Sequence, residues 1–172
     1  GVFLKHYHCN YGDSLKSVLP DTKPYYERYV RVPRLKYDAS GNLWMTNTGT
    51  QDIIKVLKSE GAWTTLPYKD IAKNPTMVDI LFDSRGWLWV TSLQAEAGLF
   101  CAKMNGTPLD TSDDETKFVY AHFKNQDGAS YDIYQLYSLV EDRNGQMWIG
   151  TNAGLFVLPN PKKFFDGSVT FN

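Results

Sequence analysis

A short pattern occurs three times in this chain of 172 residues. In each copy an Asp is followed three residues later by a Gly, and a Trp flanked by aliphatic residues stands three residues after the Gly. The copies are Asp38, Gly41 and Trp44; Asp83, Gly86 and Trp89; and Asp142, Gly145 and Trp148. Gly permits the positive φ of a tight turn, and an Asp side chain can accept hydrogen bonds from nearby amides. Each copy therefore predicts a polar turn that leads into a buried strand.

The copies are spaced like the blades of a β-propeller. Asp83 lies 45 residues after Asp38, and Asp142 lies 59 residues after Asp83. A period of roughly 40–50 residues with short strands is typical of propeller blades. We expect an all-β fold with four-stranded blade units at about 34–76, 77–135 and 136–172, preceded at 1–33 by the end of another blade and a loop. About three blades plus part of a fourth would be an incomplete fragment, since closed propellers have roughly 4–8 blades.

The bulk composition restricts the partners. The net charge is −1, which gives no electrostatic reason to expect nucleic-acid binding. The aromatic content is 15 %, which suits all-β packing or a ligand-binding surface. An incomplete propeller exposes strand edges, so we also expect self-association through those edges.

Recurrence separates structural residues from functional ones. A catalytic group is needed once, whereas a turn-stabilising Asp and a packing Trp are needed in every blade. We therefore assign structural roles to the three repeated Asp, Gly and Trp residues. Trp87 departs from the pattern, because the equivalent positions hold Asn42 and Gln146. It is the candidate ligand-binding residue, as a carbohydrate or partner contact, and the alternative is a packing role under the long insertion at 105–117.

That insertion also contains a candidate calcium site. Asp110, Ser112 and Asp114 place oxygen atoms at alternate positions, as calcium-binding loops do. However, the Gly and the twelfth-position Glu of such loops are missing, and a solvated acidic hairpin tip explains the residues equally simply. We expect no cofactor.

Other chemistry-bearing residues form no complete site. His6 and His8 alternate onto one face of a strand, but no third metal ligand is placed near them in the sequence. Cys9 and Cys101 predict either a disulfide or two separate thiols, one of them packed in a strand. The chain shows no nucleophile elbow, catalytic carboxylate pair or phosphate-binding glycine loop. We therefore expect no enzymatic activity.

The third copy carries a family resemblance. The segment from Asp142 to Leu155 resembles the repeat of two-component regulator propellers, which form periplasmic sensor regions of hybrid two-component systems in Bacteroidetes. A narrower resemblance covers roughly 34–166, including Asn105 to Asp114 and Pro159 to Asp166. There the chain is similar to the propeller region of PorZ-like proteins of the type IX secretion system.

These resemblances imply two functions. The PorZ-like one implies a non-enzymatic binding or scaffold propeller, in a cell-surface complex that processes secreted cargo and handles anionic lipopolysaccharide. The regulator-type one implies a periplasmic propeller that senses a glycan. Either would place the chain in the periplasm or at the cell surface, associated with the outer membrane, with envelope proteins, a glycan or lipopolysaccharide as partners. A propeller lyase or lactonase is a third hypothesis, which no set of residues supports.

Overall fold

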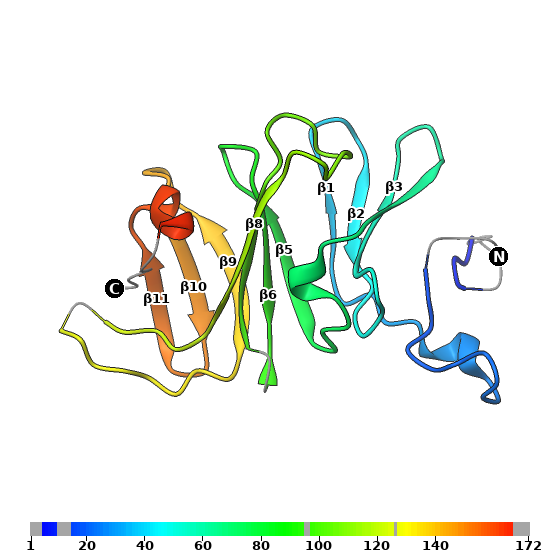
Figure 1. Ribbon diagram of the computed structural model, residues 1–172, viewed down its shortest axis with the longest axis horizontal. Helices are drawn as coiled ribbons and strands as arrows, with labels where there is room; N and C mark the ends of the chain where they lie inside the picture. Colours follow the sequence, from blue (N-terminus) through cyan, green and yellow to red (C-terminus); the bar gives the residue numbers. More distant parts are fainter. Residues whose placement is uncertain (1–4, 10–14, 95–96, 126, 167–172) are drawn as a thin grey trace, which may run out of the picture.

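Three antiparallel sheets stand side by side in the computed structural model, which describes residues 5–9, 15–94, 97–125 and 127–166 (Figure 1). The first sheet contains β1 (Leu35–Tyr37), β2 (Leu43–Thr46), β3 (Ile54–Leu57) and β4 (Trp63–Leu66). The second contains β5 (Met77–Phe82), β6 (Leu88–Ser92), β7 (Gly98–Lys103) and β8 (Glu115–Tyr120). The third contains β9 (Leu136–Glu141), β10 (Met147–Thr151) and β11 (Gly154–Leu158). Every sheet follows chain order, which confirms the all-β, blade-like architecture.

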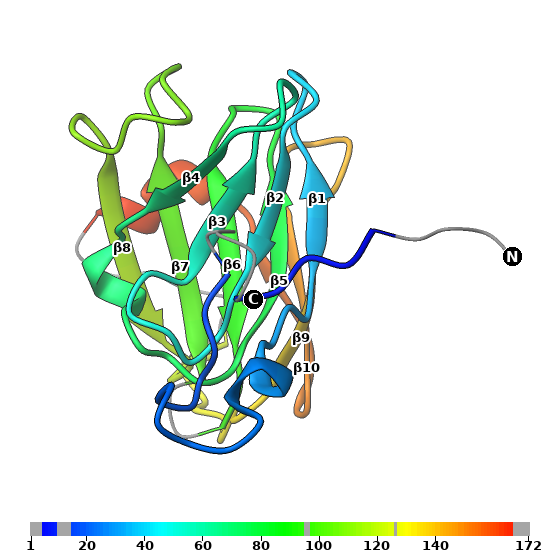
Figure 2. The same ribbon diagram turned by 90° about the vertical axis from the view of Figure 1, so that its right-hand side faces the viewer.

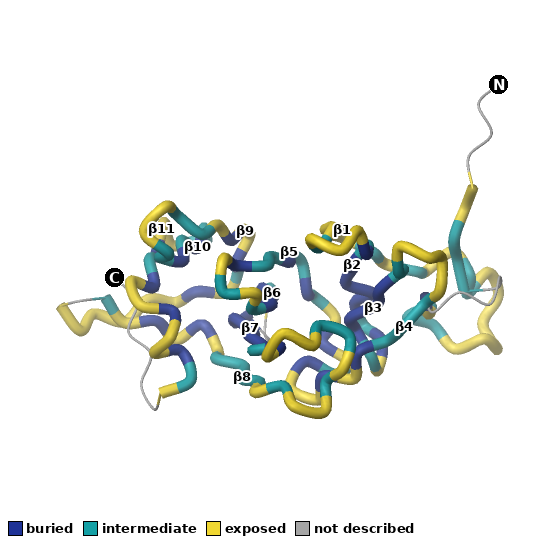
Figure 3. Tube along the Cα trace, turned by 90° about the horizontal axis from the view of Figure 1, so that it is seen from above, coloured by how far each residue is buried: buried dark blue, intermediate teal, exposed yellow. Residues whose placement is uncertain are grey.

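The first strand of each sheet lies on the same side of the row. Seen from above, β1, β5 and β9 follow one side and the outer strands β4 and β8 the other (Figure 3). Viewed along the row, the sheets stand one behind another (Figure 2). Asp79 on β5 links the three inner strands, because its carboxylate pairs with Arg34 Nε at 3.3 Å and accepts a hydrogen bond from the Leu139 amide at 3.0 Å.

Two apolar cores fill the spaces between neighbouring sheets. Between the first and second sheets, Trp44 is fully buried and its ring meets Phe82 edge to face, with centroids 5.0 Å apart. Between the second and third sheets, Trp89 is fully buried and meets Phe164 in the same way at 5.0 Å. The equivalent Trp148 is only half-buried. Burial of such large rings between blades helps to hold the sheets together.

Short 3-10 helices complete the described chain, at η1 (Tyr26–Tyr29), η2 (Lys69–Ile71) and η4 (Pro161–Phe165). No helical segment among the described residues has the length and apolar character needed to cross a membrane.

Several boundaries differ from the sequence prediction. The outer strand of the second blade begins at Glu115, inside the expected insertion at 105–117, because Lys103 and Glu115 are paired across the ladder and joined by a 2.5 Å ion pair. The described part of 1–33 contains η1 and an isolated bridge between Ser17 and Val30, and no strand of a preceding blade. The third sheet has three strands among the described residues, where the sequence predicts a four-stranded unit at 136–172, and residues 167–172 lie outside the described part of the chain.

Candidate functional site

The three Asp-x-x-Gly turns share one hydrogen-bonded geometry. Asp38 Oδ1 accepts bonds from the amides of Ser40 and Asn42, both at 2.9 Å, and Asp38 Oδ2 accepts one from Trp44 Nε1 at 2.8 Å. The corresponding Asp-to-Trp bond is 2.7 Å for Asp83 and Trp89 and 2.9 Å for Asp142 and Trp148. Each turn thus fixes its indole ring, and the rings of Trp44 and Trp89 pack between blades.

The glycines of these turns have positive φ. The values are +81° for Gly41, +80° for Gly86 and +75° for Gly145, a backbone region that other residues rarely adopt. Each Gly amide also donates to the carbonyl oxygen of its turn's Asp, at 2.9–3.2 Å. The repeated Asp, Gly and Trp residues therefore act together as local turn builders.

Hydrogen bonds to the turn also set the charge of these carboxylates. Partial burial by itself would raise the pKa of Asp38, but hydrogen bonds from Trp44, Asn42 and Ser40 outweigh it and lower the pKa. Hydrogen bonds from Trp148 and Gln146 likewise lower the pKa of Asp142. Both groups are held as carboxylates whose lone pairs are already used, which leaves little capacity for acid–base chemistry.

A polar clamp closes the space between the second and third turns. Glu141 accepts hydrogen bonds from the amide of Ser84 at 2.6 Å and its hydroxyl at 2.8 Å, and pairs with Arg85 Nη2 at 3.2 Å. Arg85 also pairs with Asp83 at 2.8 Å and donates to the Gly145 carbonyl at 3.1 Å. A Cβ at position 145 would lie 3.3 Å from Arg85 Nη1, so the close approach favours glycine there as well.

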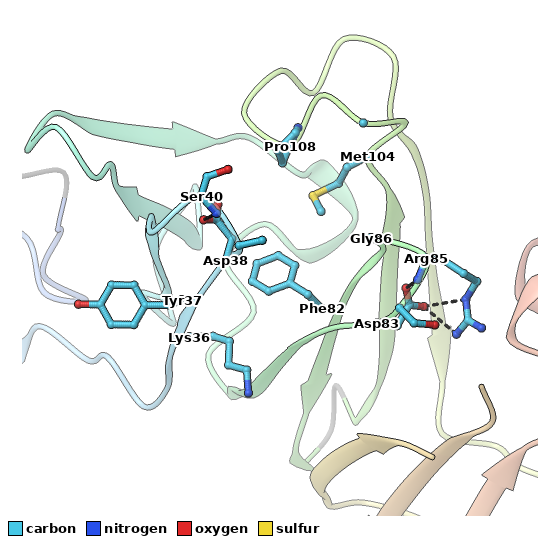
Figure 4. Close-up of a pocket in the computed structure, with 13 residues that line it drawn as sticks. Lys36, Tyr37, Asp38, Ser40, Phe82, Asp83, Arg85, Gly86, Met104 and Pro108 are labelled. Atoms are coloured by element: carbon cyan, nitrogen blue, oxygen red, sulfur yellow. Dashed lines mark hydrogen bonds and ion pairs between the residues drawn. The ribbon is translucent and has the colours of Figure 1, made fainter. Parts of the chain in front are cut away.

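The equivalent space between the first and second turns is open. Ala39 stands where the second turn has Ser84, Ser40 stands where it has Arg85, and Phe82 stands where the third blade has Glu141. These residues cannot form the clamp, and a pocket of about 510 Å³ remains between the two blades (Figure 4).

Three elements distant in sequence line this pocket. Phe82 projects from β5 toward the Asp38 turn, Met104 and Pro108 lie above it on the loop between β7 and β8, and Lys36 of β1 lies below (Figure 4). The lining combines the apolar side chains of Phe82, Met104 and Pro108 with Lys36 and the polar groups of the two turns. The size of the pocket falls within the range of roughly 300–1,000 Å³ that small-molecule sites occupy.

The loop over the pocket is fastened to the first blade. Tyr68 donates a hydrogen bond to Asp114 Oδ2 at 2.7 Å, and Thr116 donates one to Asp70 at 2.5 Å. Burial raises the pKa of the Tyr68 hydroxyl, so this group is a donor at neutral pH. Burial also raises the pKa of Asp114, whose other oxygen is buried without a hydrogen-bond partner.

The candidate calcium residues do not converge. Asp110 accepts a bond from the Ser112 amide at 3.0 Å within its own turn, whereas Asp114 is turned inward to Tyr68. No group of three or more His, Cys, Asp or Glu side chains able to hold a metal occurs in the part of the chain that the structure describes.

Trp87 lies beside the pocket rather than in it. It is half-buried, its amide donates to Asp83 at 2.9 Å, and its ring meets Phe165 edge to face at 5.6 Å. Lys103 lies over the Trp87 ring at 5.2 Å. Of the two roles considered for Trp87, packing is observed, but the partner is Phe165 of η4 in the third unit, which the repeat pattern could not place, and its role as a ligand contact stays a prediction.

The remaining candidate residues also have defined places. The rings of His6 and His8 lie 4.9 Å apart. Cys101 is fully buried in β7, forms no disulfide with Cys9, and has its pKa raised by burial. The thiol is therefore an inert core side chain.

Comparisons with known proteins agree with the fold. Residues 129–153 match the family model described as two component regulator propeller, so the chain carries that repeat. The solved structure of PorZ, an essential bacterial surface component of the type-IX secretion system of Porphyromonas gingivalis, superposes with a TM-score of 0.78 at 24 % identity. The alignment covers 98 % of this chain and 22 % of PorZ.

A second solved structure is more distant. The extracellular domain of the putative hybrid two component system BT4673 from B. thetaiotaomicron superposes with a TM-score of 0.54 at 17 % identity, covering 81 % of this chain and 16 % of that one. The comparison with curated proteins gives no match. At these identities the likeness establishes the propeller fold, and the chain spans about a fifth of the solved chains it resembles.

Proposed function

We propose that this chain is part of a non-enzymatic binding or scaffold propeller of the cell envelope. The observation that carries the proposal is the likeness to PorZ, described as a surface component, over 98 % of the chain. The second solved relative is described as an extracellular domain, which also favours a location outside the cytoplasm. Periplasm and outer cell surface are both compatible with it.

The use of the carboxylates supports binding rather than catalysis. Asp38, Asp83 and Asp142 each accept three or more hydrogen bonds from their own turns. Groups held in this way stabilise the blade, and the lowered pKa of Asp38 and of Asp142 keeps these two carboxyl groups ionised.

The finer role is a contribution to type IX secretion and to the handling of surface lipopolysaccharide. Its support is that the superposition on PorZ is closer and longer than that on BT4673, with TM-scores of 0.78 and 0.54. The alternative is glycan sensing in a hybrid two-component system, which the match at 129–153 favours.

Deletion of the full-length gene in the bacterium that carries it separates these roles. A secretion role predicts loss of surface-attached cargo, measured by proteomics of the cell surface, and retention of lipopolysaccharide on the immobilised protein. Intact secretion together with a lost transcriptional response to a glycan would overturn the secretion role and favour the sensor. Turnover of a bound glycan, detected by mass spectrometry, would contradict the non-enzymatic assignment.

Self-association is a further part of the proposal. The outer strands β4 and β8 are sheet edges whose free backbone groups can pair with another chain. Multi-angle light scattering of the full chain is expected to show a concentration-dependent rise in mass, and a monomer at all concentrations would contradict it.

A further inference from the structure

The pocket between the first and second blades has an apolar interior of limited size. Phe82, Met104, Pro108 and Ala39 contribute carbon and sulfur surface, and the volume of about 510 Å³ admits one or two rings. Its opening depends on residues that differ from those of the clamped interface, so the pocket is specific to this pair of blades.

Most hydrogen-bonding groups that line the pocket already have partners within the protein. The Asp38 carboxylate accepts four bonds from Ser40, Asn42 and Trp44. The Asp83 carboxylate is neutralised by Arg85, whose remaining donors reach Glu141 and Gly145. The acceptors of both turns are therefore already engaged, and Arg85 is already paired with two carboxylates.

The unused polar side chains are one ammonium group, which only donates, and the hydroxyls of Ser40 and Tyr37, which can donate or accept. In the described chain, the Lys36 ammonium and the Ser40 hydroxyl line the pocket and have no hydrogen-bond or ion-pair partner. Lys36 lies below the Phe82 ring, on the side away from Met104 (Figure 4). Lys36 is the charged lining group with free hydrogen-bond donors, whereas the Asp38 carboxylate keeps its negative charge but has its lone pairs engaged within its own turn. The apolar lining and the Lys36 ammonium together favour a ligand with an apolar body and an anionic end that lies at Lys36, away from Asp38.

We propose that this pocket binds a small aromatic carboxylate, with the ring against Phe82, Met104 and Pro108 and the carboxylate toward Lys36. The loop between β7 and β8 covers the ligand, fastened through Asp114 to Tyr68. This binding proposal does not depend on the cell-surface role proposed above, because it is argued from the pocket alone.

The test uses two probes that share one ring system. 1-Naphthaleneacetic acid and 1-naphthaleneacetamide are titrated into the full chain with ¹³C-labelled methionine methyl groups. The Met104 signal is expected to shift, while that of Met147, which is buried in the core between the second and third sheets, stays in place. The acid is expected to bind roughly tenfold more tightly than the amide, as one charge-assisted hydrogen bond allows.

Three variants test whether the two probes bind in this pocket. Lys36→Gln is expected to reduce the affinity for the acid to that for the amide. Ser40→Arg introduces the arginine that the second turn carries at the equivalent position. It is expected to lower the affinity for both probes at least tenfold, because the side chain fills the opening of the pocket. Asn144→Arg makes the same change in the third turn, away from the pocket, and is expected to leave both affinities unchanged.

The proposal fails on any of four results. These are equal binding of acid and amide, a shift of Met147 without Met104, full affinity in Ser40→Arg, or no binding of either probe at millimolar concentration. If thermal unfolding shows that Ser40→Arg is destabilised, Ala39→Trp replaces it, because a Trp at this adjacent exposed position also blocks the opening of the pocket. The same loss of affinity for both probes is then expected.

Discussion

The indole Nε1 of Trp89 donates a 2.7 Å hydrogen bond to Asp83 Oδ2, and the Asp83 side chain is completely buried. This carboxylate also neutralises Arg85, which joins the second blade to the third. Asp83 thus stabilises its own turn, positions the Trp89 ring between the blades and neutralises the arginine of the clamp.

Asp83→Asn is expected to destabilise the chain by about 3 kcal/mol, because it leaves the Arg85 cation partly uncompensated and places an amide against the indole N–H. Asp142→Asn is the matched control, since Asp142 makes the same turn without an arginine partner. It should cost clearly less. Urea unfolding measures both free energies, and equal losses would show that the buried ion pair adds nothing.

Arg85 and Glu141 should be energetically coupled across the blades. Their side chains are 19 % and 13 % exposed, so solvent screens the pair less than at a free surface. A double-mutant cycle with Arg85→Gln and Glu141→Gln is expected to give a coupling free energy of about 1 kcal/mol. Additive effects of the two changes would contradict a clamp.

Asp114 should make stability fall as the pH rises. Burial raises its pKa above the usual value of an aspartate, so the folded state holds the proton more tightly than the unfolded state. Its favourable contribution is complete below the unfolded pKa and is lost as the pH rises through the folded pKa. Asp114→Asn, which can still accept from Tyr68, is therefore expected to gain stability relative to the parent between pH 3 and pH 7.

Thermal midpoints across that range measure this gain. Asp127→Asn, at an exposed loop position, is the control and should run parallel to the parent. A constant difference between Asp114→Asn and the parent at all pH values would show that Asp114 titrates normally.

Trp87 is expected to contribute to stability through η4. Trp87→Ala should cost about 1–2 kcal/mol, less than a fully buried ring, because Trp87 is half-buried against Phe165. Phe165→Ala removes the other side of the contact, and the two losses should be less than additive. If Trp87→Ala instead abolished glycan or lipopolysaccharide binding without a change in unfolding free energy, Trp87 would be a ligand contact.

The blade-building parts of this chain were predictable from sequence because their interactions are local. Asp38 bonds to groups two, four and six residues further on, and the same offsets recur at Asp83 and Asp142. A pattern confined to seven residues can be recognised without knowing what lies across the interface. The repeat therefore predicted the blade-like sheets and the packing role of the repeated Trp residues.

The pocket was decided only by the tertiary structure. Lys36, Phe82 and Met104 come from three elements of two blades, and whether they enclose a space depends on the angle and distance between those blades. The same holds for Trp87 on Phe165 and for Tyr68 on Asp114, which are 78 and 46 residues apart. The sequence by itself determines the turns and strands, because their interactions are local. Contacts over such separations depend on how the blades pack. At the first interface Ser40 stands in place of an arginine and Phe82 in place of a glutamate, so no clamp forms and a gap remains.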